Sequence, residues 1–246
     1  KLQEEYLVSL KSKFIRGAVW NSISQVGAQF LNFIFTIILA QYLTPTDFGV
    51  VGQVGVIIGF LSYFCEFGFS PSLIQKKDID EIDCNTVFWG MIFIASMLYI
   101  LGFFASPLIA NFYNNNSLIL ISRILFLQFL LVPLSIVNEV LDEKKLYYQN
   151  IVQSNLISII LSVSIGITLA VTGFGVWSLI VQILLSYLFK AVLIIYWTEW
   201  RPKMIFSFSR FKEFFKSGLK FTYQNINVFL NGNMDFLLVG KLVGAS

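Results

Sequence analysis

Histidine is absent from this chain of 246 residues. Its absence excludes imidazole-based catalysis, histidine metal ligation and serine–histidine–aspartate chemistry. Charged residues are scarce as well. They make up 13 % of the chain, against about a quarter of a typical soluble domain, while 57 % of the residues are hydrophobic. We therefore expect lipid to solvate most of the chain, and we expect no metal, no cofactor and no catalytic residue.

Seven stretches are apolar over the roughly 20 residues that a helix needs to cross a bilayer. They cover residues 17–43, 49–67, 86–106, 118–141, 151–171, 175–197 and 218–244. Their hydrophobicity is continuous and shows no alternation, which argues against a transmembrane barrel. Pro133 lies inside the fourth stretch and is expected to kink it. The predicted fold class is an all-α, polytopic transmembrane helical bundle.

Lysine and arginine are missing from every second connection between these stretches. Connections 44–48, 110–117 and 172–174 carry none, whereas the segments before the first stretch and after the second, fourth and sixth are basic. Because lysine and arginine resist translocation, this asymmetry predicts a multi-pass protein with its N-terminus in the cytoplasm. It also explains the net charge of +3 without a nucleic-acid partner. Cys65 and Cys84 then face the reducing side, so we expect free thiols.

Two segments are predicted to lie on the membrane surface. Apolar residues recur every four residues from Leu2 to Phe14 and at helical spacing from Phe208 to Phe215, among charged residues. Each amphipathic helix precedes a span that carries a polar stripe, about 199 residues apart, which indicates a weak parallel repeat. We therefore expect a six-helix lobe over residues 1–200 and the first helix of a truncated second lobe over residues 201–246.

Polar side chains form a stripe along the first and seventh spans, within an arc of roughly 80° at 100° per residue. Such stripes must face other helices or water, because unpaired amides are costly in hydrocarbon. Interhelical hydrogen bonds are one explanation; we favour a water-filled cavity, because the stripes occupy corresponding positions of the repeat. The stripe residues are Asn21, Gln25, Gln29, Asn32 and Thr36 in the first span and Lys220, Gln224, Asn227, Asn231 and Asp235 in the seventh.

A few ionisable residues lie inside the predicted spans. Arg123 is the candidate for binding phosphate, because a guanidinium makes bidentate phosphate contacts; snorkelling to the headgroups is the alternative. Asp235 is the deepest acid and the candidate for proton or cation coupling. The others are expected to reach the interface, Lys190 and Lys241 by snorkelling and Glu66 and Glu139 as solvated or capping groups.

Four segments carry a family resemblance: residues 39–49 (LAQYLTPTDFG), 66–77 (EFGFSPSLIQKK), 85–89 (NTVFW) and 173–179 (GFGVWSL). Together they resemble the bacterial polysaccharide biosynthesis and O-antigen repeat-unit flippase family of the multidrug/oligosaccharidyl-lipid/polysaccharide exporter superfamily. The resemblance implies two six-helix lobes around a central cavity bordered by the first and seventh helices, in the bacterial inner membrane. The chain departs from the family pattern at Gln41, where many members carry arginine, and at Glu66, where aspartate is usual.

The resemblance implies a transporter that moves an undecaprenyl-pyrophosphate-linked oligosaccharide to the outer leaflet by alternating access. Its partners would be this lipid-linked oligosaccharide, membrane lipid and other membrane proteins of polysaccharide assembly. A multidrug or small-molecule cation antiporter of the same superfamily is an alternative, which Asp235 keeps open. A membrane enzyme of glycan assembly is disfavoured, because the outer connections are short and Asp47 is their only ionisable residue. A structural scaffold would leave the stripes unexplained.

Overall fold

The computed structural model describes the backbone of residues 2–242 and the side chains of residues 19, 20, 22–224 and 227. All regular secondary structure in this part of the chain is helical, which agrees with the predicted fold class. The helices are α1 (Leu2–Leu39), α2 (Pro45–Cys65), α3 (Phe69–Gln75), α4 (Glu81–Phe112), α5 (Ser117–Leu125), α6 (Gln128–Leu131), α7 (Pro133–Lys144), α8 (Tyr148–Val171), α9 (Val176–Trp197) and α10 (Phe208–Leu242).

Six helical stretches are long and apolar enough to cross a membrane, and they coincide with the first six predicted spans. Within the described residues α10 is not one of them, so the seventh span stays a prediction. The two surface helices are not separate elements, contrary to expectation. Each continues into the following helix, as α1 and α10, because neither junction contains a proline and a single glycine is tolerated inside a helix.

The second span is interrupted between α2 and α3, where Phe67 and Gly68 have φ values of +45° and +64°. α10 crosses the chain at this point. A Cβ on Gly218 would lie 2.2 Å from the carbonyl oxygen of Phe67, and a Cβ on Gly68 would lie 2.6 Å from that of Gly218. Only two glycines permit so close an approach, and at Gly68 the left-handed backbone requires glycine as well.

The fourth span is distorted near its middle and consists of α5, α6 and α7. Between α5 and α6 the backbone turns tightly, with Phe129 donating to the carbonyl of Phe126 and Leu130 to that of Leu127, three residues back. Pro133 begins α7, where its missing N–H costs little. The distortion predicted at Pro133 is therefore present, together with a second one a turn earlier.

Capping boxes begin two of the membrane helices. Thr44 and Asp47 exchange hydrogen bonds at the start of α2, with the Thr44 N–H donating to Asp47 Oδ2 at 2.9 Å. Asp80 and Asp83 do the same at the start of α4. Side chains of this kind satisfy backbone N–H groups that a helix leaves unpaired at its N-terminus. Asp47, the ionisable residue of the connections predicted to face outward, therefore has a structural role.

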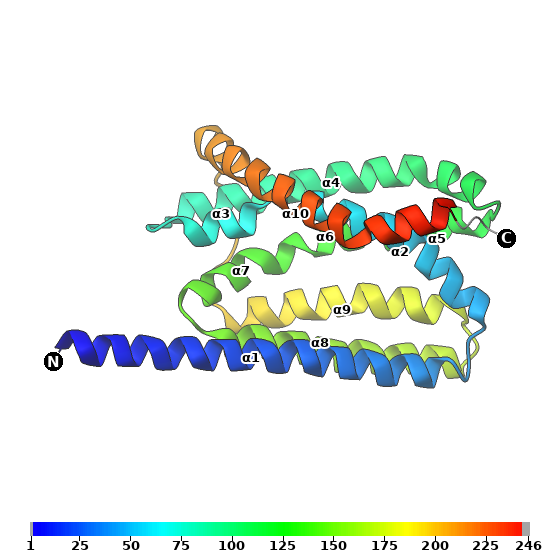
Figure 1. Ribbon diagram of the computed structural model, residues 1–246, viewed down its shortest axis with the longest axis horizontal. Coiled ribbons are helices and arrows are strands. Elements are labelled where there is room, and N and C mark those ends of the chain that lie inside the picture. The colour runs from blue at the N-terminus through cyan, green and yellow to red at the C-terminus, as the bar shows by residue number, and fades with distance from the viewer. Residues whose placement is uncertain (1, 243–246) are drawn as a thin grey trace.

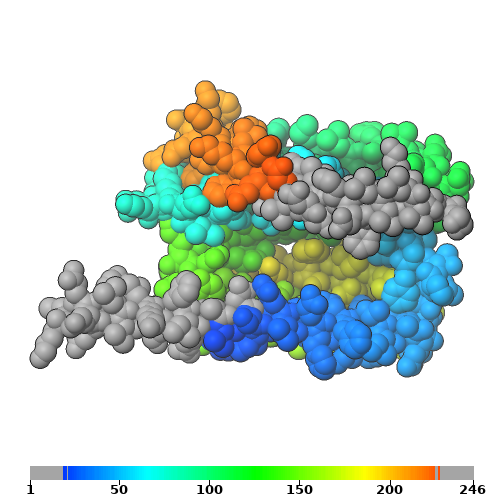
Figure 2. Space-filling view, viewed as in Figure 1, coloured from blue at the N-terminus to red at the C-terminus, as the bar shows by residue number. Residues whose placement is uncertain are grey.

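The helices form two groups that meet at α9. α8 and α9 are joined by a tight turn and lie side by side, and α1 runs along α8 (Figure 1). α4 packs with α5 and α7 on the other side of the bundle, where α3 and α10 cover its end. In Figure 2 the described part of α1, in blue, lies along the lower edge, and atoms of α9, in yellow, are visible above it. α9 contacts helices of both groups and so holds them together.

The segment between α9 and α10 is bound to the start of α4. Asn85 Oδ1 accepts a hydrogen bond from the Lys203 N–H at 2.5 Å, and Trp89 Nε1 donates to the Lys203 carbonyl at 2.8 Å. Thr86 Oγ1 accepts from the Ser207 N–H at 3.2 Å. These contacts explain why polar residues are buried in the first turns of a membrane helix. They also fasten the segment that leads out of the six-helix part.

Asp83 is the ionic centre of this junction. Its side chain is 0 % exposed, and Lys76 Nζ and Arg210 Nη1 lie 2.8 Å and 3.1 Å from Oδ1. Arg210 also reaches Asp80 at 3.3 Å. The backbone N–H of Asp83 and then Arg210 and Lys76 hold the pKa of Asp80 below its usual value. One arginine of α10 is thereby joined to α4, so charge as well as apolar packing fixes the position of α10 at its first turn.

We predict that Asp83→Asn, made in the full-length protein, lowers stability by about 3 kcal/mol. Two cations would lose their shared buried carboxylate, and breaking a buried pair costs several kcal/mol. The matched control is Glu81→Gln, because the Lys203–Glu81 pair at 2.6 Å is about half exposed and should contribute less than about 1 kcal/mol. Thermal unfolding of the purified protein in detergent, followed by intrinsic fluorescence, measures both. Equal melting temperatures for the two variants would contradict the structural role of Asp83.

Candidate functional site

A polar groove runs along α1 where this helix lies against α8. It has a volume of about 640 Å³. Asn155 of α8 is one of its lining residues, and the others belong to α1. The α1 residues are Ser24, Gln25, Ala28, Gln29, Asn32, Phe33 and Thr36. The structure thus brings four residues of the predicted first-span stripe to one surface, since positions three and four apart share a face of a helix.

The packing of α1 against its neighbours explains the orientation of the stripe. Phe35 and Leu39 are buried in a cluster with Ala170 and Leu179. A Cβ on Gly166 of α8 would lie 3.2 Å from the Phe35 ring, so this glycine lets the two helices approach closely. The apolar face of α1 is consequently turned toward α8 and α9. The polar stripe then follows the edge of that contact.

The amide groups of the groove differ in their hydrogen bonding. Asn155 Nδ2 donates to Ser24 Oγ at 3.1 Å, and Thr36 Oγ1 donates to the carbonyl of Asn32 at 2.8 Å. The side chains of Gln25, Gln29 and Asn32 are exposed and have no hydrogen-bond partner among the residues whose side chains are described. Three amides on one surface are thus available to a ligand rich in hydroxyl groups.

The remaining residues of the two stripes do not line this groove in the described part of the chain. Gln224 is exposed, and Asn227 donates to the carbonyl of Tyr223 at 3.0 Å. The side chains of Asn21, Asn231 and Asp235 lie outside the described residues, as does that of Lys241. A cavity shared by the first and seventh helices, and a coupling role for Asp235, therefore remain predictions.

Arg123 lies away from the groove, on α5 against α4. Its Nε donates to Ser106 Oγ at 2.9 Å and to the carbonyl of Phe103 at 3.4 Å, and its Cζ stands 4.1 Å from the centre of the Phe103 ring. A cation over an aromatic face is stabilised by the ring quadrupole. The structure does not bring Arg123 together with the amides of α1. Its partners could not be identified from the sequence, because they depend on how α4 and α5 pack.

Lys190 was expected to snorkel to the interface, but it does not. Its Nζ lies 3.0 Å from Glu139 of α7, inside the bundle.

Sequence reasoning also missed Ser24 and Asn155 as groove residues. The signal for Asn155 was present, since an amide in an apolar stretch calls for a partner on another helix. No group of three or more cysteine, aspartate or glutamate residues in the described part of the chain could hold a metal ion.

Comparison with known proteins identifies the family. The sequence profile of the polysaccharide biosynthesis protein family matches residues 38–246. The chain belongs to this family. This match includes α2 to α10 but only the last two residues of α1, so the α1 residues that line the groove lie outside it.

Three curated relatives are similar to almost the whole length of this chain. The teichuronic acid biosynthesis protein TuaB of Bacillus subtilis is 27 % identical, over 96 % of this chain and 50 % of the relative. The lipopolysaccharide biosynthesis protein WzxC of Escherichia coli is 26 % identical, over 97 % and 49 %. The succinoglycan biosynthesis transport protein ExoT of Rhizobium meliloti is 26 % identical, over 94 % and 47 %. The chain thus spans about half the length of these relatives, and no solved structure matches it.

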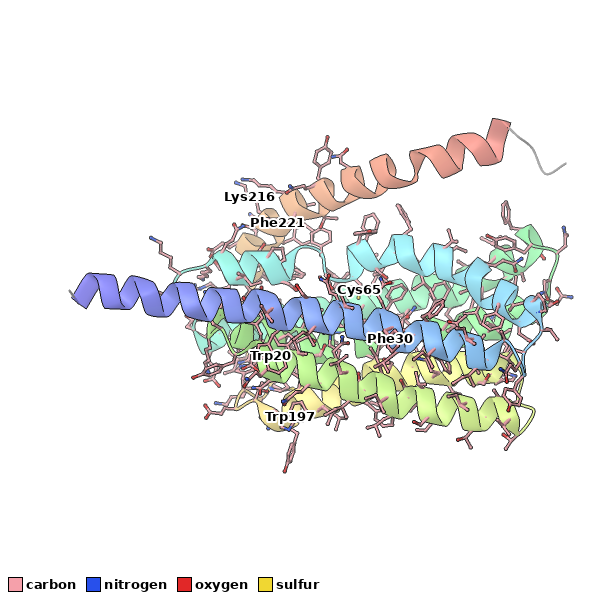
Figure 3. All side chains as sticks on the ribbon, turned by 60° about the horizontal axis from the view of Figure 1, so that its bottom comes forward. Trp20, Phe30, Cys65, Trp197, Lys216 and Phe221 are labelled. Carbon is pink, nitrogen blue, oxygen red and sulfur yellow. The ribbon has the colours of Figure 1, made fainter. Side chains whose placement is uncertain are left out.

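We predict that the groove along α1 contains water in the membrane. Cysteines introduced at Gln25 and Asn32 should react with a hydrophilic, membrane-impermeant thiol reagent. Phe30 and Ile37 are the matched controls, because they are 61 % and 50 % exposed on the same helix but are apolar and expected to face lipid. Figure 3 shows Phe30 on α1. Labelling is measured by mass spectrometry on intact membranes. The native Cys65 and Cys84 are buried, and the unsubstituted protein gives their background. Equal labelling at all four positions would argue against a hydrated groove.

Proposed function

We propose that this chain forms the first lobe, and the beginning of a second, of a membrane exporter for a lipid-linked oligosaccharide. The substrate would be an undecaprenyl-pyrophosphate-linked repeat unit, moved from the cytoplasmic to the outer leaflet by alternating access of two lobes. The N-terminus would face the cytoplasm of a bacterial inner membrane, with lobes divided near residue 200. Other membrane proteins of polysaccharide assembly would be its partners. The family, and the similarity to the succinoglycan biosynthesis transport protein ExoT, support this proposal.

The unpaired amides of Gln25, Gln29 and Asn32 carry the proposal. Moving sugar hydroxyls through hydrocarbon is forbidden by the cost of stripping their water, unless the protein replaces those hydrogen bonds. Amide side chains both donate and accept, so they suit hydroxyl groups of either orientation. A groove of about 640 Å³ that is open along one side is compatible with a glycan whose polyprenyl tail stays in lipid.

The groove favours an oligosaccharide over the cation of a multidrug antiporter. Among the described residues that line it, none is acidic, and polar atoms come from serine, threonine and amide side chains. An organic cation would need a carboxylate in its binding site to replace the water that it loses. The antiporter alternative therefore depends on Asp235, whose side chain lies outside the described residues.

The groove can be tested with Gln25→Leu combined with Gln29→Leu in the full-length protein. Loss of two hydrogen bonds of about 1 kcal/mol each should reduce export at least about tenfold. The matched control is Phe30→Leu on the same helix, which should leave export unchanged. Surface glycan and the lipid-linked unit retained inside are measured together, with protein abundance by immunoblot. Normal surface glycan in the double variant would exclude the groove as a sugar-binding site.

Arg123 remains our candidate for the pyrophosphate, and its packing on Phe103 suggests a sharper test. Arg123→Ala should abolish surface glycan at unchanged protein abundance, while Arg123→Lys keeps part of the activity because the charge survives. Ser106→Ala is the control, because it removes the hydroxyl bonded to Nε and leaves the guanidinium in place. If Arg123 is purely structural, Arg123→Ala and Ser106→Ala should both lower thermal stability. Neither variant should then lose export, and that result would contradict a role in binding pyrophosphate.

A further inference from the structure

Three ionisable side chains line one small cavity beside the break in the second span. Its volume is about 180 Å³. Glu66 follows the last residue of α2 and is exposed, while Glu139 of α7 and Lys190 of α9 are mostly buried. Polar groups of Tyr187, Gln128 and two serines also line the cavity. Figure 3 shows Cys65, the neighbour of Glu66, well inside the bundle rather than at its ends.

Glu139 and Lys190 form a pair within this cavity. Lys190 Nζ donates to Glu139 Oε2 at 3.0 Å and lies 3.0 Å from Oε1, and the two side chains are 27 % and 21 % exposed for lysine and glutamate. Glu139 Oε1 is buried and accepts no hydrogen bond from the residues whose side chains are described. The pair is electrically neutral. Both carboxylate oxygens of Glu139 thus lie within ion-pair distance of the same ammonium.

Glu66 is the charge that this pair does not balance. Two carboxylates face one ammonium, so the cavity carries one excess negative charge when all three groups are ionised. Cys65, beside Glu66, is buried, and α10 approaches the neighbouring Gly68 through Gly218 and Phe221. The cations of α10 near this contact, Lys216 and Lys220, are exposed. Glu143, one turn beyond Glu139 on α7, adds a further negative charge. No described group therefore cancels the excess.

Glu66 lies within a membrane-spanning stretch, where an ionised carboxylate is costly, and binding a proton removes that charge. A metal cation such as Na⁺ would have to sit beside the ammonium of Lys190 and would be repelled by it. A proton needs only a carboxylate oxygen that no cation holds, and Glu66 supplies one, because its side chain makes no ion pair with the described residues. The charges of the cavity thus select a proton rather than a larger cation.

We infer that Glu66, Glu139 and Lys190 form an intramembrane site that takes up and releases one proton. In the loaded state a carboxylate of the cavity becomes a neutral carboxyl group by accepting a proton from water, and release reverses this step. Glu66 directly precedes Phe67 and Gly68, where the second span breaks and Gly218 of α10 makes its close contact. Protonation therefore occurs at the junction between the six-helix part and α10. Use of this proton to drive export rests on the function proposed above.

The test is a pH titration of the purified full-length protein by infrared difference spectroscopy, which detects the carbonyl stretch of a protonated carboxyl group. Wild type should show one such band that disappears as the pH rises. Glu66→Gln and Glu139→Gln should each abolish it, because either change leaves one carboxylate balanced by Lys190. Lys190→Met should shift its midpoint upward by about one pH unit or more, because both remaining carboxylates lose their counter-charge.

The control is Glu199→Gln, at an exposed position just after α9, which should leave the band unchanged. Thermal unfolding confirms that each variant is folded, and Gln keeps the shape of Glu. A band that persists in both Glu66→Gln and Glu139→Gln would overturn the inference. So would a midpoint that shifts when Na⁺ replaces choline at constant ionic strength, since that result assigns the cavity to a metal cation. The measurement needs no substrate, so failure of the exporter proposal would leave it readable.

Discussion

The cost of an unpaired polar group in hydrocarbon governs the arrangement of polar residues in this bundle. Serine and threonine hydroxyls inside the spans donate to carbonyls three or four residues back in their own helix, as in Ser122, Ser158 and Thr168. A hydroxyl is therefore satisfied without a partner helix. The longer amides are less easily satisfied locally. Where they lack partners, water or a ligand must supply the hydrogen bonds.

This distinction separates the groove from the rest of the bundle. Asn138 Oδ1 accepts from Thr198 Oγ1 at 2.8 Å, and Asn150 Nδ2 donates to Asp142 at 2.9 Å, so these two amides join segments of different helices. Asn138 Nδ2 and Gln53 Oε1 have no partner among the described residues, but unlike the groove amides they are buried. On α1 only Asn155 reaches across from α8, to Ser24. Gln25, Gln29 and Asn32 stay open to the outside of the helix pair. The difference is one of position, because the same residue type joins helices in one place and is left for a ligand in another.

Charged groups inside the bundle are placed where helices from distant parts of the chain must stay together. Asp83 joins Lys76 to Arg210, and Glu139 joins α7 to Lys190 on α9. The first site fixes the start of α10 on α4. The second lies under the break between α2 and α3, which α10 also touches. Both sites therefore lie near the junction between the six-helix part and α10.

The sequence alone determined the six spans, the helical class, the distortion at Pro133 and the polar face of α1, because hydropathy and helical periodicity are local properties. Tertiary structure decided which of the polar residues meet. It paired Lys190 with Glu139 across 51 positions and Asn155 with Ser24 across 131. It also placed Arg123 on Phe103 rather than beside the stripe. The physical reason is that a short-range ion pair or hydrogen bond forms only when two helices have a particular rotation and height. Those quantities follow from packing at sites such as Gly166 and Gly218, where the absence of one side chain allows two helices to touch.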